Sequence, residues 1–142
     1  ILTLDGRVMV IDFGLMKQIE RELEMSGPLI KAIGTVEFAP PEQYADSGVS
    51  TDVRSDIYSV GATLLYLLTN ELPPRAIDRM LPASINVHTT LPSLQKINPS
   101  VSKLTQQVIA KAMEIDPEER YQSARQMREA LFPRKRFITL PF

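Results

Sequence analysis

The sequence Gly34-Thr35-Val36-Glu37-Phe38-Ala39-Pro40-Pro41-Glu42 decides how the rest of this chain is interpreted. Pro40 and Pro41 have no backbone N–H and a fixed φ, so they forbid a regular helix or a central strand at this place. Glu42 follows them directly and carries a carboxylate. We therefore predict a stiff, irregular segment that holds Glu42 in a defined position.

Upstream of this stretch, the chain is expected to begin with a β-hairpin. Residues 1–4 and 7–11 are short, largely apolar runs separated by Asp5-Gly6. This dipeptide is typical of a two-residue type I′ turn, in which both central residues have positive φ. The return strand would deliver Asp12-Phe13-Gly14 at its end. By itself, that tripeptide is more often an ordinary strand end than a functional site.

Residues 15–37 show no sustained hydrophobic period, and Ser26-Gly27-Pro28 interrupts them. A long irregular segment inside a compact domain is usually functional or disordered.

Downstream, the apolar pattern predicts helices. Residues 52–69 carry apolar side chains at i, i+3 and i+4, and others on the opposite face, which predicts a helix buried nearly all round. Residues 75–81 are expected to form a short helix, and 82–100 a loop rich in Pro, Ser, Thr and Asn.

Two further helices are predicted from their capping residues. Ser102 can cap a helix that Asp116-Pro117 stops. The run Ser123-Ala124-Arg125-Gln126 matches a capping box and begins the last helix, which Pro133 ends. The predicted order is a hairpin, a long loop and then helices.

Composition excludes several functional classes. The 142 residues fit one domain, and a net charge of -1 gives no global attraction to nucleic acid. The absence of cysteine excludes disulfides and thiolate sites, and His88, the single histidine, stands in a polar loop. No segment approaches the length of a membrane span. A cytoplasmic location is expected, with a membrane-anchored parent left open, and the start at Ile1 suggests a fragment of a longer chain.

Four motifs follow one another in order: Asp12-Phe13-Gly14, the stretch 34–42, Ser55-Asp56-Ile57-Tyr58-Ser59-Val60-Gly61, and Asp116-Pro117-Glu118-Glu119-Arg120-Tyr121. This set resembles the C-terminal lobe of eukaryotic-like Ser/Thr protein kinases, most closely the bacterial branch. The resemblance implies an α+β fold, a mostly α-helical lobe with an N-terminal β-hairpin. Residues 1–132 would be a partial kinase catalytic domain and residues 133–142 a tail.

The resemblance assigns cofactor roles near the start of the chain. Asp12 resembles the kinase aspartate that holds Mg²⁺, and a carboxylate is the hard oxygen ligand that this ion prefers. Phe13 resembles the residue whose packing sets active and inactive states, and Gly14 lets the backbone turn sharply. Leu2 resembles the strand residue beneath the adenine ring of ATP, although plain strand core is an almost equally good interpretation.

By the same resemblance, residues 15–33 form the activation loop. Ser26 is its hydroxyl residue and a candidate phosphorylation site, although a simple turn residue beside Gly27 and Pro28 is the favoured interpretation. Thr35 matches the threonine that marks Ser/Thr kinases. In the family it supports the catalytic loop and can itself be phosphorylated.

Three more residues have structural roles in the resemblance. Pro40-Pro41-Glu42 stands where most members have Ala-Pro-Glu, and Glu42 is expected to form an ion pair with Arg120. Asp56 resembles the buried acid that anchors the catalytic-loop backbone from the start of the central helix.

The resemblance implies transfer of the ATP γ-phosphoryl group to protein Ser/Thr hydroxyls, with Mg²⁺. The sequence, however, contains no Gly-rich loop, strand Lys or catalytic-loop Asp and Asn, so the chain alone is expected to be inactive. The expected partners are a protein substrate and the upstream N-lobe of the same parent chain. The alternatives are a pseudokinase or truncated scaffold that binds partners, and an unrelated helical domain in which Glu42 and Arg120 would not touch.

Overall fold

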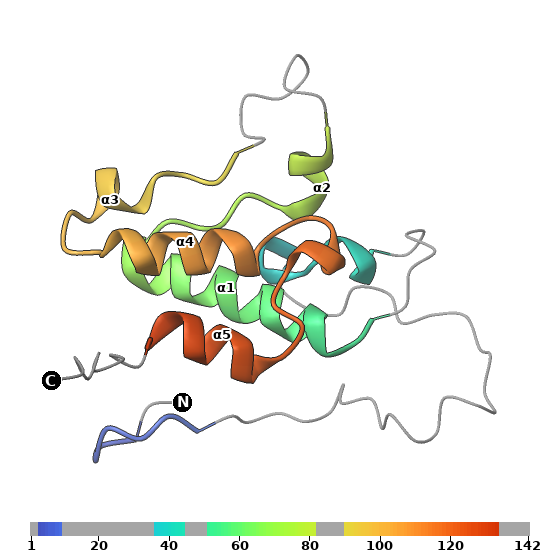
Figure 1. Ribbon diagram of the computed structural model, residues 1–142. Helices are drawn as coiled ribbons and strands as arrows, with labels where there is room; N and C mark the ends of the chain where they lie inside the picture. Colours follow the sequence, from blue (N-terminus) through green and yellow to red (C-terminus); the bar gives the residue numbers. More distant parts are fainter. Residues whose placement is uncertain (1–2, 10–35, 45–50, 82–89, 134–142) are drawn as a thin grey trace, which may run out of the picture.

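Helix α4 (Lys103–Ala112) packs against both α1 (Val53–Thr69) and α5 (Ala124–Leu131) in the computed structural model (Figure 1). The structure describes residues 3–9, 36–44, 51–81 and 90–133. In chain order these form the 3-10 helices η2 (Val36–Phe38) and η3 (Pro41–Gln43), then α1, α2 (Ala76–Met80), α3 (Leu94–Ile97), α4 (Lys103–Ala112), the 3-10 helix η4 (Pro117–Glu119) and α5 (Ala124–Leu131). The described part is thus mostly helical, as predicted.

Helix α1 has well-defined caps at both ends. The Asp52 carboxylate accepts a hydrogen bond from the backbone N–H of Arg54 at 2.7 Å, while the Ser55 hydroxyl accepts one from the N–H of Asp52 at 3.3 Å. Such reciprocal bonds satisfy N–H groups that the first turn leaves without helical partners. At the other end, Asn70 takes a left-handed conformation with φ 57°. The helix predicted over residues 52–69 is confirmed.

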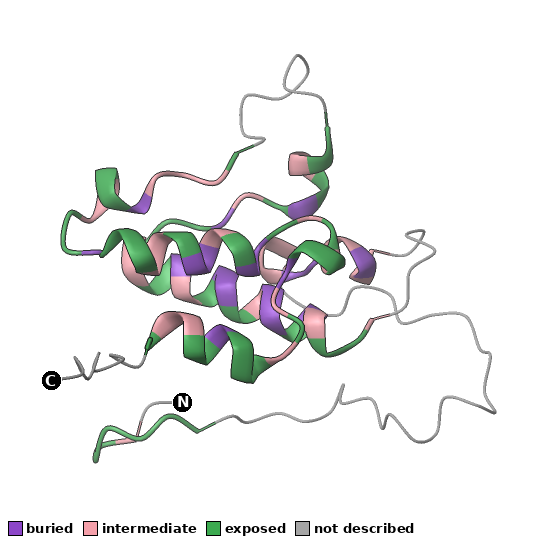
Figure 2. Ribbon diagram, viewed as in Figure 1, coloured by how far each residue is buried: buried purple, intermediate pink, exposed green. Residues whose placement is uncertain are grey.

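The core forms where α1 packs against α4. Tyr58, Ala62 and Leu65 on α1 are fully buried, as are Ile109 and Met113 on the α4 side. A second cluster joins Ile57 of α1, Val108 and Ala112 of α4, and Met127 of α5. Figure 2 shows these buried positions concentrated on the facing sides of the helices.

Gly61 permits the close approach of α1 and α4. A Cβ atom at this position would lie 2.9 Å from Ala112 Cβ and 2.9 Å from Met113 Cγ. These separations are far below ordinary carbon–carbon contact, so a residue without a side chain is needed at the crossing.

The prediction that α1 is buried nearly all round was wrong for the described part of the chain. Val53, Val60 and Leu67 have exposed fractions of 50%, 48% and 71%. They recur every seven residues, so they share one face of the helix. No element within the described ranges covers this face completely.

The turn at the start of the chain also differs from the prediction. Thr3 N–H donates to Arg7 O at 2.8 Å and Gly6 N–H donates to Thr3 O at 2.9 Å. Gly6 has φ 79°, whereas Asp5 does not have positive φ. Because only Gly6 accepts that conformation without strain, the turn is centred on Leu4 and Asp5 with Gly6 as a bulge, not a type I′ turn. Residues 3–9 contain no strand, and the remainder of the predicted hairpin lies outside the described residues.

Three of the other predicted helices are confirmed. Ser102 and Ser123 cap α4 and α5 by accepting hydrogen bonds from Thr105 N–H and Gln126 N–H. The side chain of Gln126 reaches the N–H of Gln122, one residue before the position that a capping box requires. Helix α4 ends at Ala112, before the predicted stop at Asp116-Pro117.

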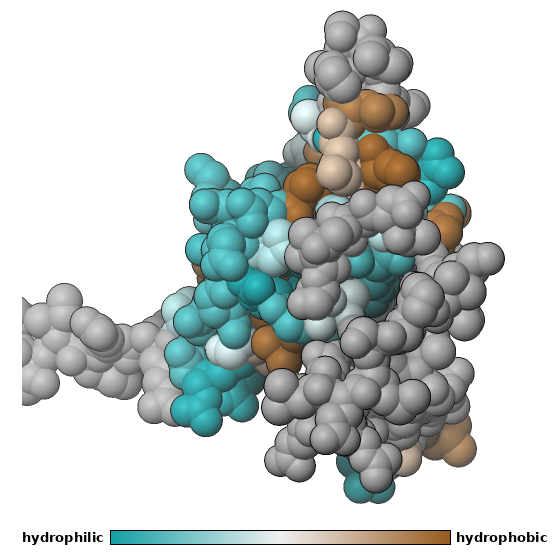
Figure 3. All heavy atoms as spheres, turned by 90° about the vertical axis from the view of Figure 1, so that its right-hand side faces the viewer, coloured by the Kyte–Doolittle hydropathy of each residue, from teal (hydrophilic) through white to brown (hydrophobic). Residues whose placement is uncertain are grey.

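Of the short helices α2 and α3, only α2 was predicted from the sequence. Helix α2 was predicted and is present, and its residues Ile77 and Met80 are exposed, as is Leu81 directly after it. Figure 3 shows apolar residues gathered in the upper part of one face of the molecule. Helix α3 falls in a segment predicted to be loop. It forms because Leu94 is drawn into the core, where it is 1% exposed.

We predict that Gly61→Ala destabilises the chain. Crowding at the crossing should cost about 1–3 kcal/mol, which exceeds the helix-propensity gain of about 1 kcal/mol. Thr63→Ala, at an exposed position of α1, is the matched control and should change stability by less than about 0.5 kcal/mol. Urea unfolding measures both variants. A Gly61→Ala chain as stable as the parent would show that the crossing is looser than described.

Candidate functional site

The predicted site residues fall into two groups. Glu42, Asp56 and Arg120 belong to the described residues. The remaining candidates lie outside them: Leu2, Asp12, Phe13, Gly14, Ser26 and Thr35. The structure therefore describes the structural part of the candidate site, and the assignments near the start of the chain stay predictions.

Glu42 and Arg120 form a buried ion pair, as the resemblance implied. Arg120 Nη1 lies 2.7 Å from Glu42 Oε1, and Nη2 lies 3.0 Å from Oε2. The side chains of Arg120 and Glu42 are 0% and 3% exposed. Two parallel bonds between a guanidinium and a carboxylate are the strongest form of this interaction and fix its geometry.

Main-chain carbonyls take up the other donors of Arg120. Nε donates to Glu114 O at 2.7 Å, Nη1 to Arg54 O at 3.0 Å and Nη2 to Ile115 O at 3.0 Å. Together with the two bonds to Glu42, these occupy all five N–H donors that a guanidinium carries. Its Cζ lies 5.0 Å from the ring centre of Tyr58, within the range of a cation–π contact.

The same site holds the segment 36–44 against α1. The Ser55 hydroxyl donates to Glu42 Oε1 at 2.7 Å, and the Ser59 hydroxyl donates to Phe38 O at 3.0 Å. The ring of Phe38 meets that of Tyr66 edge to face, with centres 5.9 Å apart. Three side chains along one helix thus fix the proline-rich segment and the carboxylate it carries.

The electrostatics of Glu42 favour its charged form. Burial alone raises the pKa of this carboxyl, but hydrogen bonds from Arg120 and Ser55 outweigh burial and hold the pKa below its ordinary value. Burial also raises the pKa of the neighbouring Tyr58 phenol, which therefore stays neutral at physiological pH.

Asp56 is not buried by the described part of the chain, and its role as an anchor of the catalytic-loop backbone stays a prediction. It lies in the first turn of α1 and its side chain is exposed. None of the described elements supplies the backbone that it was expected to anchor. Its position near the helix N-terminus still stabilises the carboxylate through the helix dipole.

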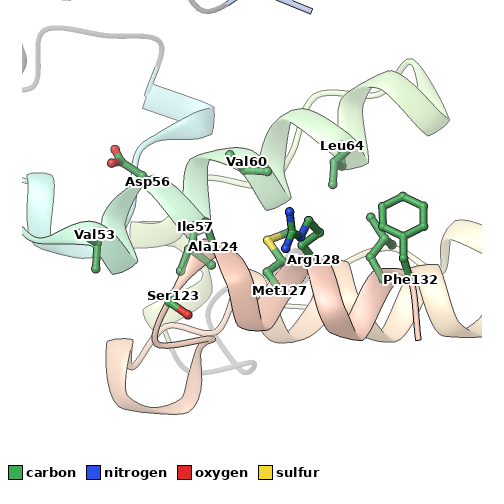
Figure 4. A pocket seen from close by; sticks show the side chains of 11 residues that line it. Val53, Asp56, Ile57, Val60, Leu64, Ser123, Ala124, Met127, Arg128 and Phe132 are labelled. Carbon is green, nitrogen blue, oxygen red and sulfur yellow. The ribbon is translucent and has the colours of Figure 1, made fainter. Parts of the chain in front are cut away.

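Asp56 lies at the edge of an apolar groove between α1 and α5, with a volume of about 460 Å³ (Figure 4). The groove walls combine Val53, Ile57, Val60 and Leu64 of α1 with Ala124, Met127, Leu131 and Phe132 from the end of the chain, and Arg128 also contributes. The exposed face of α1 opens into this groove.

The described residues contain no group of three or more His, Asp or Glu side chains that could hold a metal ion. Asp12, the predicted ligand of Mg²⁺, is not among them. None of the helices in the described ranges has the length and apolar character that crossing a membrane requires.

Sequence reasoning missed the residues that complete the ion pair. Ser55 and Tyr58 were named only as members of a motif. In the structure Ser55 donates a hydrogen bond to Glu42, and the ring of Tyr58 lies against Arg120. Arg54 was also missed, although it links Asp52 at 2.7 Å with Glu118 at 2.6 Å and so ties the start of α1 to η4. The signal available was the run 52–59, whose polar residues interrupt an otherwise apolar helix.

Comparison with known families agrees with this geometry. The sequence profile of the protein kinase domain matches residues 1–132. The chain therefore belongs to the protein kinase domain family.

Several bacterial Ser/Thr kinases are similar to this chain. Serine/threonine-protein kinase B of Synechocystis is 38% identical over 89% of the chain and 21% of its own length. Serine/threonine-protein kinase Pkn1 of Myxococcus xanthus is 35% identical over 87% of the chain and 18% of its own length. Serine/threonine-protein kinase PrkC of Bacillus subtilis is 32% identical over 86% of the chain and 18% of its own length. The chain spans about a fifth of the length of the curated relatives it matches.

We predict that Arg120→Ala destabilises this lobe by about 3–5 kcal/mol, because it leaves the Glu42 carboxylate buried without its partner. Arg128→Ala is the matched control, since Arg128 is exposed on α5 and its side chain forms no ion pair with any described residue. The control should shift stability by less than about 0.5 kcal/mol. Thermal and urea unfolding compare the two variants, and an unchanged melting temperature for Arg120→Ala would contradict a stabilising role.

The lowered pKa of Glu42 also predicts how stability depends on pH. The unfolded chain binds a proton at Glu42 more readily than the folded chain, so the ion pair's contribution is fully present above the ordinary glutamate pKa of about 4.3. It is lost as the pH falls through the folded pKa. Urea unfolding from pH 7 to pH 3 should therefore show that the difference in free energy of unfolding between the unsubstituted 142-residue chain and Glu42→Gln becomes smaller in acid. A difference that stays constant across this interval would be inconsistent with the prediction.

Proposed function

We propose that this chain forms the C-terminal part of the catalytic domain of a Ser/Thr protein kinase, which transfers the γ-phosphoryl group of ATP to Ser or Thr hydroxyls of protein substrates. The observation that carries the proposal is the buried Glu42–Arg120 pair, which joins two motifs separated by 78 residues in the sequence. Family membership and the similarity to bacterial Ser/Thr kinases support it. Residues 1–132 would be the partial catalytic domain and residues 133–142 a tail.

Asp12, Phe13, Gly14 and Leu2 are assigned to the nucleotide side of the site. The carboxylate of Asp12 has the donor chemistry that Mg²⁺ prefers, and it would hold the ion against the phosphates of ATP. Mg²⁺, when bound, neutralises the charge that develops on the transferring phosphoryl group. Phe13 and Gly14 orient Asp12, and Leu2 packs beneath the adenine ring.

Thr35 and the segment 36–44 are assigned to the protein-substrate side. Thr35 supports the catalytic loop and so helps to position the acceptor hydroxyl. The bonds from Ser55 and Ser59 to the segment 36–44 support this assignment, because they hold its backbone rigid against α1. Phosphorylation of Ser26 or Thr35 would add charge to the segment that leads into it.

The chain alone is proposed to be inactive, because its sequence has no Gly-rich loop, strand Lys or catalytic-loop Asp and Asn. The upstream part of the same parent chain, with its N-lobe, would supply them. Asp56 is assigned to anchor the backbone of the catalytic loop, which accounts for an exposed carboxylate at the edge of an apolar groove. Phosphoryl transfer depends on positioning, so one metal ligand without the other groups is insufficient.

A second candidate function is partner binding by a pseudokinase or truncated scaffold. It is favoured by the exposed stripe of Val53, Val60 and Leu67, since apolar groups on a regular helix face suit a packed partner. For both candidates we propose a cytoplasmic location and no nucleic-acid partner, and membrane anchoring of the parent protein is compatible with either.

The kinase proposal predicts four results in a Mg²⁺–ATP assay with a generic protein substrate. The parent polypeptide containing the upstream motifs should phosphorylate the substrate, whereas the 142-residue chain should not. Asp12→Asn in that parent should lower the rate by at least about a hundredfold, the scale on which removal of one charge-stabilising group acts. Asp78→Asn, which changes a carboxylate on α2 away from the site, should leave the rate within about twofold.

Two outcomes would decide against the proposal. Activity of the 142-residue chain by itself would refute its dependence on upstream residues. An inactive parent, or a parent gene that lacks the His-Arg-Asp loop, the strand Lys and the Gly-rich loop, would favour the scaffold.

A further inference from the structure

Three consecutive carbonyl groups after α4 bind two different arginines. Met113 O accepts a bond from Arg79 Nη1 at 2.6 Å. Glu114 O and Ile115 O accept bonds from Arg120 Nε at 2.7 Å and from Arg120 Nη2 at 3.0 Å. These carbonyls follow the C-terminus of α4, where the helix dipole is negative, so cations are favoured beside this turn.

The ring of Tyr58 contacts both arginines. Arg120 lies over its face, and Arg79 Nη1 lies 3.5 Å from its hydroxyl oxygen. Tyr58 is 0% exposed, so it cannot move to a second position without disturbing the core. Arg79 and Arg120 therefore share two supports, the turn 113–115 and one aromatic ring.

Arg79 has no carboxylate partner among the described residues, and its Nε is buried there without a hydrogen bond. A half-buried cation without an ion pair and with an unpaired donor is unfavourable in itself. The hydrogen bonds of Arg79 instead stabilise the turn 113–115 and the position of the Tyr58 ring. The sequence gives no sign of this role, since Arg79 stands in no recognised motif.

We infer that Arg79 is a positioning residue for the Glu42–Arg120 ion pair. It holds Met113 O and the Tyr58 hydroxyl, and thereby fixes the carbonyls and the ring that orient the guanidinium of Arg120. Helix α2, which carries Arg79, is thus mechanically connected to the segment 36–44, which carries Glu42. This connection does not depend on whether the chain takes part in phosphoryl transfer.

The test follows the Nε–Hε signal of Arg120 by NMR in the 142-residue chain labelled with ¹⁵N-arginine. Arg79→Met keeps the apolar stem and removes the guanidinium. It should shift the Arg120 signal and speed its hydrogen exchange by at least about tenfold, as expected when a bond to a charged group is weakened. Arg75→Met is the matched control, because Arg75 also belongs to the α2 region and pairs only with Asp78 in the described part. It should leave the Arg120 signal unchanged.

Two further variants separate positioning from general destabilisation. Tyr58→Phe keeps the ring and removes the hydroxyl, so it should reproduce part of the shift. Arg79→Lys keeps the charge and a donor, and should restore part of the protection lost in Arg79→Met. If Arg79→Met unfolds the chain by circular dichroism, Tyr58→Phe decides: a shifted Arg120 signal supports the inference, and an unchanged signal overturns it. An unchanged Arg120 signal in a folded Arg79→Met chain overturns it directly.

Discussion

The guanidinium of Arg120 is the constraint on which the described part of the structure depends. It is fully buried and satisfies all its donors on Glu42 and on the carbonyls of residues 54, 114 and 115. These partners belong to the proline-rich segment, the start of α1 and the turn after α4. Segments that are far apart in the sequence therefore meet at one charged group.

A buried ion pair contributes less to the stability of a fold than to the uniqueness of its geometry. Removing two charges from water is costly, and a pair of apolar residues could be as stable. A satisfied guanidinium, however, accepts only one arrangement of its partners, whereas apolar residues tolerate several. We infer that the main effect of the pair is to make the position of the segment 36–44 unique, and that Ser55, Tyr58 and Arg79 strengthen this effect.

Helix α1 connects this site with the rest of the lobe. One of its faces packs on α4 at Gly61, another binds the segment 36–44 through Ser55 and Ser59, and a third faces the groove beside α5. Its apolar residues exceed what the described elements bury. In the proposed kinase, the third face is the one available to the upstream part of the parent chain, beside the Asp56 carboxylate.

Local features of the structure could be predicted from the sequence, because they depend on neighbouring residues. Ser102 and Ser123 begin helices through their own hydroxyls, and the apolar period of residues 52–69 defines α1. Features set by distant residues were mispredicted or missed. The segment around Leu94 is helical because the Leu94 side chain packs into the core. The burial of α1 depends on which elements pack against it, and the hydrophobic period of its own sequence does not reveal them.

The ion pair illustrates the same limit in the candidate site. Spacing alone says nothing about a contact between Glu42 and Arg120, and it was expected only because the motifs resemble those of kinases. Arg79 lacks such a resemblance, so its contact with Tyr58 could be found only in three dimensions.

The most direct test of this account is a double-mutant cycle between Glu42 and Arg120. The free energy of unfolding is measured for the unsubstituted 142-residue chain, Glu42→Gln, Arg120→Met and the double variant. If the pair organises the lobe, the two substitutions are strongly non-additive, with a coupling energy of at least about 2 kcal/mol. Additive effects, with a coupling energy near zero, would show that the two side chains act independently and would contradict the central claim.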